Sequence, residues 1–214
     1  EAVHVQFGVV LGEDRRRLRS RSGEPVKFID LLDEAVERAG AAIAEKNPDL
    51  DDAARAEVAN AIGIGAVKYA ELSTDRVKDY IFDWDRALAF DGNTAPYLQY
   101  AHARICSLFR RAEAERDEAA RWPITLREDA ERDLALQILA YPTAVGAVLE
   151  SYSPHKLCNY AYALATAFTS FYEKCPILRS DEEVKQSRLA LADLTARVLA
   201  EALGLLGIEA PERM

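Results

Sequence analysis

The sequence predicts a mainly α-helical fold, and three observations support this. Apolar residues recur at steps of three, four and seven through most of the chain, as they do on one face of a helix. Turn and capping signals separate these periodic stretches. A looser alternation that includes Val3, Val5 and Phe7 is confined to the first ten residues and predicts one terminal strand. We therefore expect a helical bundle that follows a short strand.

Two long helices are expected in the first third of the chain. The first runs from Ile29 to about Lys46, with an apolar stripe that an Asn-Pro pair ends. The second begins within residues 49–52 and runs towards residue 72. Gly63 and Gly65 weaken this helix by up to about 1 kcal/mol each relative to alanine, but glycines at this spacing permit close packing.

The middle of the chain combines a loop with a capped helix. Residues 79–90 mix aromatic side chains with aspartates, which favours a structured loop, and an Asp-Gly-Asn turn follows. Thr94 is the expected N-cap of a helix that runs towards Ala114 and carries Pro96 in its first turn. We expect His102 to be a hydrogen-bonded helix residue and not a catalytic base.

The last part of the chain predicts four more helices after Trp122-Pro123 breaks the pattern. Their expected ranges are Thr125 to Leu139, Pro142 to Glu150, Pro154 to Glu173 and Asp181 to Leu206, with Gly207 after the last. An apolar stripe on the final helix indicates packing into a bundle.

Length and composition set further limits. A chain of 214 residues with 50% hydrophobic content can hold one large domain, or one domain and part of another. The start of the chain shows no signal peptide, and no uninterrupted apolar segment approaches the roughly 20 residues that span a bilayer. Three scattered cysteines and three scattered histidines favour reduced thiols and no structural metal. We expect a soluble, cytoplasmic protein without a membrane partner.

Charge gives a mixed indication about nucleic acid. The formal net charge of -9 argues against a general nucleic-acid coat, because phosphate binding depends on cationic side chains. Local basic surfaces remain open, since positive charge is dense from Arg15 to Arg21 and thinner from Arg104 to Arg121. Such runs are usually solvated faces, so charge alone assigns no phosphate contact.

Several stretches of unusual residue order resemble class I arginyl-tRNA synthetases. They are HVQFG (His4 to Gly8), RLRSRSGE (Arg17 to Glu24), RVKDYIFDWDRALAFDGNTAPYLQYAHARICS (Arg76 to Ser107) and LLGIEAPERM (Leu205 to Met214). The resemblance covers nearly the whole chain and implies the C-terminal portion of such an enzyme, without its front half. Residues 1–92 would be a remnant of the Rossmann-type catalytic domain with connecting helices. Residues 93–214 would form the α-helical anticodon-binding domain and reach the natural C-terminus.

The resemblance places RLRSRSG at the KMSKS-type loop, which in the family binds ATP and stabilises charge on its phosphates. The candidate residues are Arg17, Arg19, Ser20 and Arg21, with Ser20 where the general motif has its second lysine. By itself this run equally fits a flexible surface segment. The HIGH motif and the amino-acid pocket lie upstream in the family, so we expect no complete catalytic site, no bound cofactor and no arginine activation by this chain. ATP and Mg²⁺ would serve the full-length enzyme.

Two tRNA-contacting regions follow from the resemblance. Residues 79–94 match a loop near the tRNA acceptor end, where Tyr80, Trp84 and Asn93 are the candidates for nucleotide contact. The aromatic side chains of this loop could instead pack into a small core beneath it. We expect core packing for Phe82, whereas for Tyr80 and Trp84 core packing and nucleotide contact are equally supported.

The family places an anticodon-contacting tyrosine at Tyr172 and a terminal methionine at Met214. We add Lys156 and Asn159 as secondary anticodon contacts. RNA recognition commonly stacks splayed bases on aromatic side chains, and each stacked base contributes about 1–3 kcal/mol. Phe168 has the spacing of a core residue.

The expected partners are tRNA(Arg) and the catalytic half of the same enzyme, with no DNA, and the chain is expected to be a monomer. One alternative is a synthetase-derived helical module that binds a protein through its apolar stripes. Another is a specialised paralogue without an aminoacylation role. The PERM ending and the retained loop at residues 79–94 favour tRNA binding.

Overall fold

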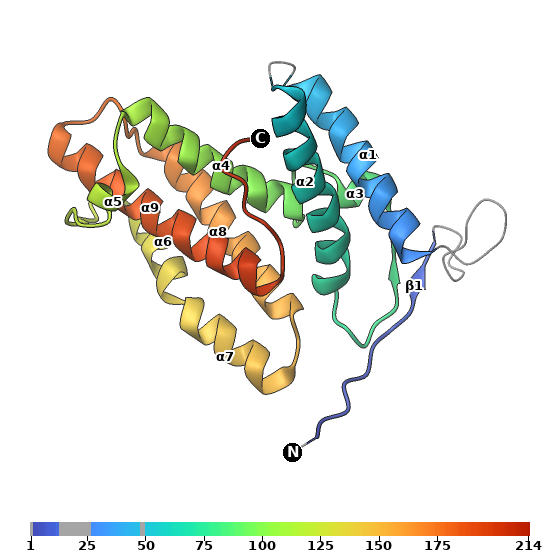
Figure 1. Cartoon of the computed structure of the whole chain (residues 1–214). Helices are drawn as coiled ribbons and strands as arrows, with labels where there is room; N and C mark the ends of the chain where they lie inside the picture. Colours follow the sequence, from blue (N-terminus) through green and yellow to red (C-terminus); the bar gives the residue numbers. More distant parts are fainter. Residues whose placement is uncertain (1, 13–26, 48–49) are drawn as a thin grey trace.

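The computed structural model describes residues 2–12, 27–47 and 50–214, and over these it confirms a mainly α-helical fold (Figure 1). In chain order, its elements are β1 (Val10–Leu11), α1 (Phe28–Lys46), α2 (Asp52–Leu72), β2 (Tyr80–Ile81), α3 (Trp84–Ala87), α4 (Ala95–Ala112), α5 (Arg116–Ala119), α6 (Asp129–Leu139), α7 (Tyr141–Ser151), α8 (His155–Lys174) and α9 (Glu182–Leu205). The terminal strand is shorter and later than the alternation predicts: Val3, Val5 and Phe7 lie outside it, and two residues, Val10 and Leu11, pair in parallel with β2.

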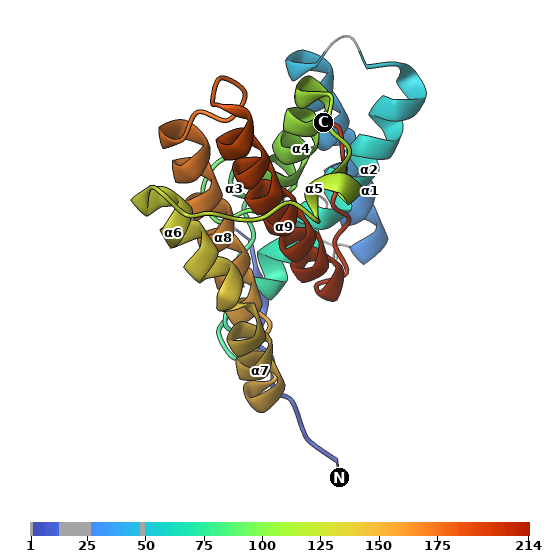
Figure 2. The same cartoon turned by 90° about the vertical axis from the view of Figure 1, so that its left-hand side faces the viewer.

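The helices form two adjoining groups. The first group is the antiparallel pair of α1 and α2 together with β1, β2 and α3. The second group is a bundle of α4 and α6 to α9, whose helices appear side by side in both views (Figures 1 and 2). α2 packs against α4 and so joins the two groups. The largest core lies inside the bundle, where Leu98, Ile105, Leu164, Phe168 and Leu199 are all buried. Phe168 is therefore a core residue, as its spacing predicts.

α1 and α2 approach each other closely at Gly63. A Cβ atom at this position would lie 2.6 Å from the backbone nitrogen of Val36 and 2.7 Å from the carbonyl carbon of Ala35. Only a residue without a side chain allows the two backbones to come this close. The expectation that the glycines of this helix permit close packing is confirmed.

The capping signals identify most helix ends. Thr94 caps α4, because its side-chain oxygen accepts a hydrogen bond from the backbone N–H of Tyr97 at 3.3 Å. Gly207 follows the last helix with φ of +68°, a conformation that favours glycine. The loop before α4 is structured, as predicted, and Phe82 is buried in a small core beneath it.

The predicted start of the helix at Thr125 is wrong, because α6 begins four residues later at Asp129. The Ser187 side chain on α9 accepts a hydrogen bond from the Thr125 N–H at 2.8 Å and donates one to the Thr125 carbonyl at 3.1 Å. This pairing holds Thr125 against a neighbouring helix and outside a helix of its own. The predicted pattern also omits the short helix α5, and within the predicted loop it omits the strand β2 and the short helix α3.

Within the described residues, one stretch has the length and hydropathy of a membrane span, namely Asp129–Ser151, with a mean hydropathy of 1.3 over its most apolar window. It covers both α6 and α7. An ion pair 2.6 Å long joins Glu131 at its start to Arg188 of α9, and Leu134 and Ile138 enter the bundle core. These contacts place its first half in the bundle.

Candidate nucleic-acid interface

A groove of about 670 Å³ opens between α4, the end of α8, the turn after α1 and the last two residues of the chain. Its lining combines cationic and aromatic side chains. These are Arg104, Arg110, Arg111 and Arg213, together with Tyr100 and Tyr172. Among the described lining residues there is no aspartate or glutamate, although the whole chain carries a net charge of -9. The groove is thus a local basic surface on an acidic protein.

Arg104 organises the aromatic side chains of the groove. Its guanidinium carbon lies 5.0 Å from the ring centroid of Tyr100 and 5.2 Å from that of Tyr172. Tyr100 precedes Arg104 by one helical turn of α4, so the two side chains share a face. Cation–π contacts at these distances hold both rings beside one positive charge. The arrangement offers aromatic faces and a cation to a single ligand.

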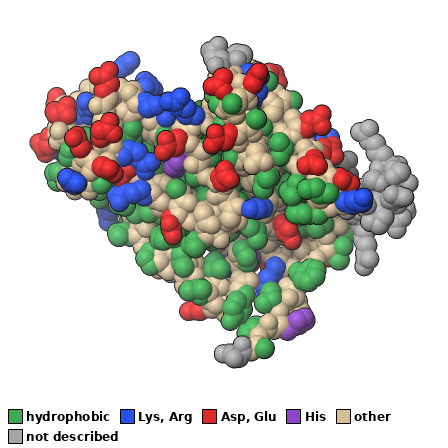
Figure 3. Space-filling view, in the orientation of Figure 1, with side chains coloured by type: hydrophobic (Ala, Val, Ile, Leu, Met, Phe, Trp, Pro, Cys, Tyr) green, Lys and Arg blue, Asp and Glu red, His purple; other side chains and the backbone are tan. Residues whose placement is uncertain are grey.

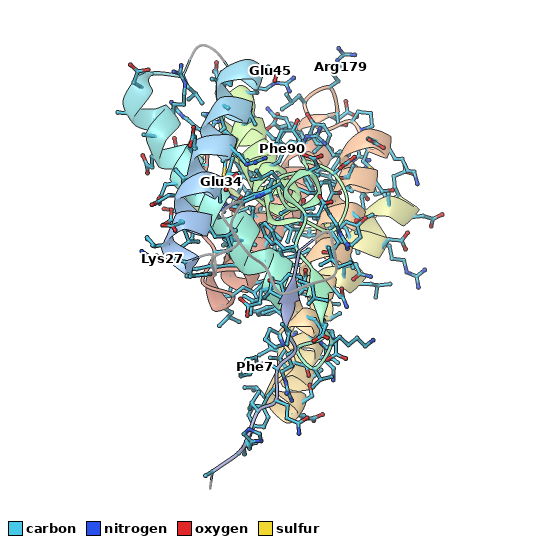
Figure 4. All side chains as sticks on the ribbon, turned by 90° about the vertical axis from the view of Figure 1, so that its right-hand side faces the viewer. Phe7, Lys27, Glu34, Glu45, Phe90 and Arg179 are labelled. Carbon is cyan, nitrogen blue, oxygen red and sulfur yellow. The ribbon has the colours of Figure 1, made fainter. Side chains whose placement is uncertain are left out.

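Tyr172 lies between two hollows. On one side it lines the basic groove, and on the other a smaller hollow of about 280 Å³ that includes Arg111, Pro176 and Arg179. Its ring is half-buried and packs against Phe168 with centroids 5.9 Å apart. Arg179 projects outward at the upper edge of the molecule (Figure 4). The exposed edge of Tyr172 is therefore accessible beside several positive charges.

The surface view agrees with this distribution. Lys and Arg side chains gather along the upper edge of the bundle near the end of α4, and Asp and Glu side chains are spread over the visible face, including the neighbouring left edge of the bundle (Figure 3). RNA phosphates need such a concentration of cations, and stacked bases need exposed aromatic faces. The groove supplies both.

Met214 lines the same groove as Tyr172. Its backbone oxygen accepts a hydrogen bond from Asn47 Nδ2 at 3.1 Å, and it packs against a small apolar cluster that includes Ile43 and Ile62. The structure therefore brings together two residues that are 42 positions apart in the sequence.

Lys156 and Asn159 lie in a different place, near the start of α8. Asn159 precedes Tyr172 by 13 residues of this helix, which is about 20 Å at 1.5 Å per residue. Its side-chain oxygen accepts a hydrogen bond from Asn93 Nδ2 at 3.3 Å, and Lys156 is exposed nearby. The four candidates for the anticodon site thus form two pairs at opposite ends of one helix.

A second cavity, of about 380 Å³, lies between α2 and the segment that leads from β2 to α4. Tyr80 and Asn93 both line it. The hydroxyl of buried Tyr69 donates to Asn93 Oδ1 at 2.6 Å and fixes the amide. Burial, and then the carboxylate of Glu71, raises the pKa of Tyr80 to about 12, so its hydroxyl is a proton donor at neutral pH.

Trp84 does not line this cavity. Its ring packs edge-on against Phe82, with centroids 4.8 Å apart, and the guanidinium of Arg38 covers it at 4.8 Å from the centroid. The structure therefore brings together Tyr80 and Asn93 and gives Trp84 protein partners.

The candidates of the ATP loop, Arg17, Arg19, Ser20 and Arg21, lie outside the described residues. In the part of the chain that the structure describes, no group of three or more His, Cys, Asp or Glu side chains could hold a metal ion.

Sequence reasoning did not select the cationic lining of the groove. Arg104, Arg110 and Arg111 belong to the basic stretch to which charge alone assigned no phosphate contact, and Tyr100 and Arg213 complete a lining that the candidate site residues did not include. Tyr100, Arg104 and Arg111 follow one another at steps of four and seven on α4, which predicts a shared helix face. That spacing was the available signal, but nothing local indicates that the end of the chain completes the site.

Two family matches agree with this arrangement. Residues 1–84 match the family described as tRNA synthetases class I (R), catalytic domain, and residues 98–214 match the DALR anticodon binding domain. The chain belongs to the DALR anticodon-binding family. Most of the basic groove falls inside the DALR match, since only its rim from the turn after α1 comes from outside residues 98–214.

Relatives of this DALR chain carry a consistent name. The chain is 54% identical to an arginine-tRNA ligase of Chromobacterium violaceum, over 99% of this chain and 36% of that protein. It is 51% identical to an arginine-tRNA ligase of Escherichia coli O9:H4, over 99% of this chain and 37% of that protein. The chain thus spans a little over a third of the length of these curated relatives. The resemblance to class I arginyl-tRNA synthetases is confirmed.

Solved structures show the same similarity. The arginyl-tRNA synthetase of Thermus thermophilus matches with a TM-score of 0.85 and 35% identity, over 97% of this chain and 35% of that one. The Plasmodium falciparum arginyl-tRNA synthetase matches with a TM-score of 0.83 and 31% identity, over 99% of this chain and 35% of that one. The DALR bundle and the helices before it therefore share one arrangement with both enzymes.

Proposed function

We propose that this chain is the tRNA-binding segment of an arginine-tRNA ligase, and that its basic groove binds the anticodon loop of tRNA(Arg). The observation that carries the proposal is the lining of the groove. Two tyrosines and four arginines line it, with no aspartate or glutamate among the described lining residues, in a chain whose net charge is -9. Anionic RNA with unstacked bases is the ligand that such a lining fits.

The proposed division of work follows from the side chains. Tyr172 and Met214 offer apolar surface to a splayed base, while Arg110, Arg111 and Arg213 are exposed for contact with phosphates. Arg104 is set between the tyrosine rings and adds a donor to the same surface. Because the groove makes and breaks no covalent bond, its contribution to the ligase reaction is the positioning of the tRNA.

A second tRNA contact is proposed at the other end of α8. Tyr80 and Asn93 line one cavity, and Asn159 adjoins Asn93. We propose that this surface faces the acceptor arm when the anticodon loop occupies the basic groove. Lys156, exposed beside it, would meet the RNA backbone. Trp84 would act there indirectly, by packing beneath the loop.

The remaining parts of the function belong to the complete ligase. We propose that residues 1–92 accompany its catalytic domain and that residues 93–214 form the anticodon-binding domain. The ligase reaction would use ATP and Mg²⁺, with Arg17, Arg19, Ser20 and Arg21 in the ATP loop, and would proceed in the cytoplasm on a monomeric enzyme. This chain by itself would bind tRNA without activating arginine.

The test is a fluorescence titration of labelled tRNA(Arg) with this chain, beside the same tRNA with its anticodon replaced, at low and moderate salt. The proposal predicts tighter binding to the native anticodon at both salt concentrations. Binding that is equal for the two RNAs and disappears with salt would contradict it, because only non-specific electrostatic attraction would remain. That outcome would favour a protein-interaction module.

A further inference from the structure

The last eight residues, Gly207 to Met214, form a strap that leaves the end of α9 and runs back between α2 and α4 (Figure 1). Side chains of the neighbouring elements meet its backbone carbonyls along its whole length. The pairs are Lys68 Nζ with Gly207 (2.5 Å), Gln99 Nε2 with Glu209 (2.9 Å), His102 Nδ1 with Pro211 (3.0 Å), Arg110 Nη1 with Glu212 (3.3 Å) and Asn47 Nδ2 with Met214 (3.1 Å).

These contacts fix the path of the strap and not its side chains. Each acceptor is a backbone carbonyl, so the donors define where the chain runs whatever residues it carries. Three donors, Gln99, His102 and Arg110, project from α4, and Lys68 projects from α2. The strap is thus tied to both helix groups of the molecule.

Gln99 is the most deeply placed of these donors. It is fully buried, and its amide nitrogen donates to Ala61 of α2 at 3.0 Å as well as to the strap. Gly65 leaves the space that this arrangement needs, because a Cβ there would lie 3.0 Å from Gln99 Nε2 and 3.2 Å from Ile208 Cγ2. Ile208 is itself buried, which anchors the start of the strap in the core.

His102 donates a hydrogen bond to the strap from its Nδ1 atom. The Pro211 carbonyl can only accept a hydrogen bond, so the proton of the ring lies on Nδ1. Burial lowers the pKa of His102, which keeps the ring neutral near pH 7. A neutral ring with this tautomer acts as a fixed donor and replaces the water that the carbonyl would otherwise bind.

We infer that Gln99 and His102 are positioning residues for anticodon recognition, because they hold the strap that places Met214 in the groove that Tyr172 also lines. The inference rests on the proposed function, since it assumes that the Tyr172–Met214 groove is the reading site. Neither residue lines that groove. They act on RNA binding through the strap, and their loss releases Met214 from the groove.

The experiment uses the fact that Met214 is the only methionine in this sequence. In a chain freed of its initiator methionine, a [¹³C-methyl]methionine label therefore gives one resonance, which reports the surroundings of Met214. His102→Leu removes the donor, and His102→Asn retains an N–H donor in nearly the same position. Lys68→Leu removes an exposed contact with the strap and leaves the core unchanged.

The inference predicts that the methionine resonance moves towards the value of an unfolded chain in His102→Leu and, less far, in Lys68→Leu. The preference for the native over the replaced anticodon should fall about five- to tenfold in His102→Leu, the loss of part of one stacked-base contact. His102→Asn should restore both readouts. General destabilisation would not be repaired selectively in this way.

A Met214 resonance and an anticodon preference that both stay unchanged in folded His102→Leu would overturn the inference. Absence of any anticodon preference in the unsubstituted chain would instead overturn the proposed function. The methionine resonance still tests the strap in that case, since it needs no RNA.

Discussion

The buried carboxylate of Glu131 is surrounded by hydrogen-bond donors. Glu131 is 2% exposed, and its carboxylate accepts hydrogen bonds from the backbone N–H groups of Arg127 (2.6 Å) and Glu128 (3.0 Å) and from Arg188 Nε (2.6 Å). Burial by itself raises the pKa of Glu131, but these donors outweigh it and hold the pKa below its usual value. The charged form is therefore the one that the fold stabilises.

The lowered pKa of Glu131 predicts the sign of a pH effect. Its contribution to stability is complete above the unfolded-state pKa of about 4.3 and is lost as the pH falls through the lower folded-state value. Glu131→Gln should remove this part of the acid dependence and, by leaving Arg188 without its carboxylate, lower the free energy of unfolding by about 3–5 kcal/mol. Urea denaturation between pH 7 and acid pH measures both.

Glu183→Gln is the matched control for this prediction. Glu183 pairs with Arg127 at 2.7 Å but its side chain is 76% exposed, so its loss should change stability by less than about 1 kcal/mol. Equal effects of the two substitutions would show that burial does not determine how much the Glu131–Arg188 ion pair contributes to the free energy of unfolding.

Residue environments were predictable where they depend on local pattern. Phe82 is an apolar side chain in a loop that is rich in aspartates, and the pattern therefore predicts that Phe82 is buried, as it is. The groove lining depends on distant chain segments, because Arg104 meets Tyr172 across 68 positions and Met214 joins them only through the strap. Sequence spacing indicates a shared face on one helix, but it cannot indicate which segments cover that face.

At the scale of the elements, the close packing of α1 against α2 depends on one glycine. Gly63 in the middle of α2 lies against the backbone of α1 at Ala35 and Val36. A glycine inside a helix normally costs stability relative to alanine. The close packing of the two helices offsets that cost here.

Gly63→Ala should therefore lower the free energy of unfolding by about 1–3 kcal/mol, because the added methyl group forces α1 and α2 apart. Gly146→Ala in α7 is the control, since nothing lies within 4 Å of its Cβ position. That substitution should raise stability by about 0.5–1 kcal/mol through helix propensity. Thermal unfolding of both variants measures the contrast, and changes of the same sign would contradict the packing account.

Element boundaries were predictable where a cap fixes them and not where a distant side chain does. Thr94 and Gly207 carry local signals, and both mark helix ends as expected. Thr125 carries no such signal, because the hydrogen bonds that keep it out of α6 come from Ser187, 62 positions away. Long-range contacts of this kind decide the remaining differences.

At the scale of the whole molecule, an acidic chain presents one groove whose described lining holds four arginines and no acidic side chain. α8 links the two proposed tRNA contacts, with Tyr172 near one end and Asn159, about 20 Å away, near the other. The strap ties the α1–α2 pair to the bundle beside the groove. The two proposed tRNA contacts therefore lie at opposite ends of one helix.

The most direct measurement is the affinity of Tyr172→Ala, Tyr172→Phe and the unsubstituted chain for tRNA(Arg) with its native and with a replaced anticodon. If a base stacks on Tyr172, the alanine variant should lose about 1–3 kcal/mol with the native anticodon and much less with the replaced one. Tyr172→Phe, which keeps the ring, should retain most of the preference. An equal loss for both RNAs in a folded Tyr172→Ala protein, or no loss for either, would contradict the claim that this groove reads the anticodon.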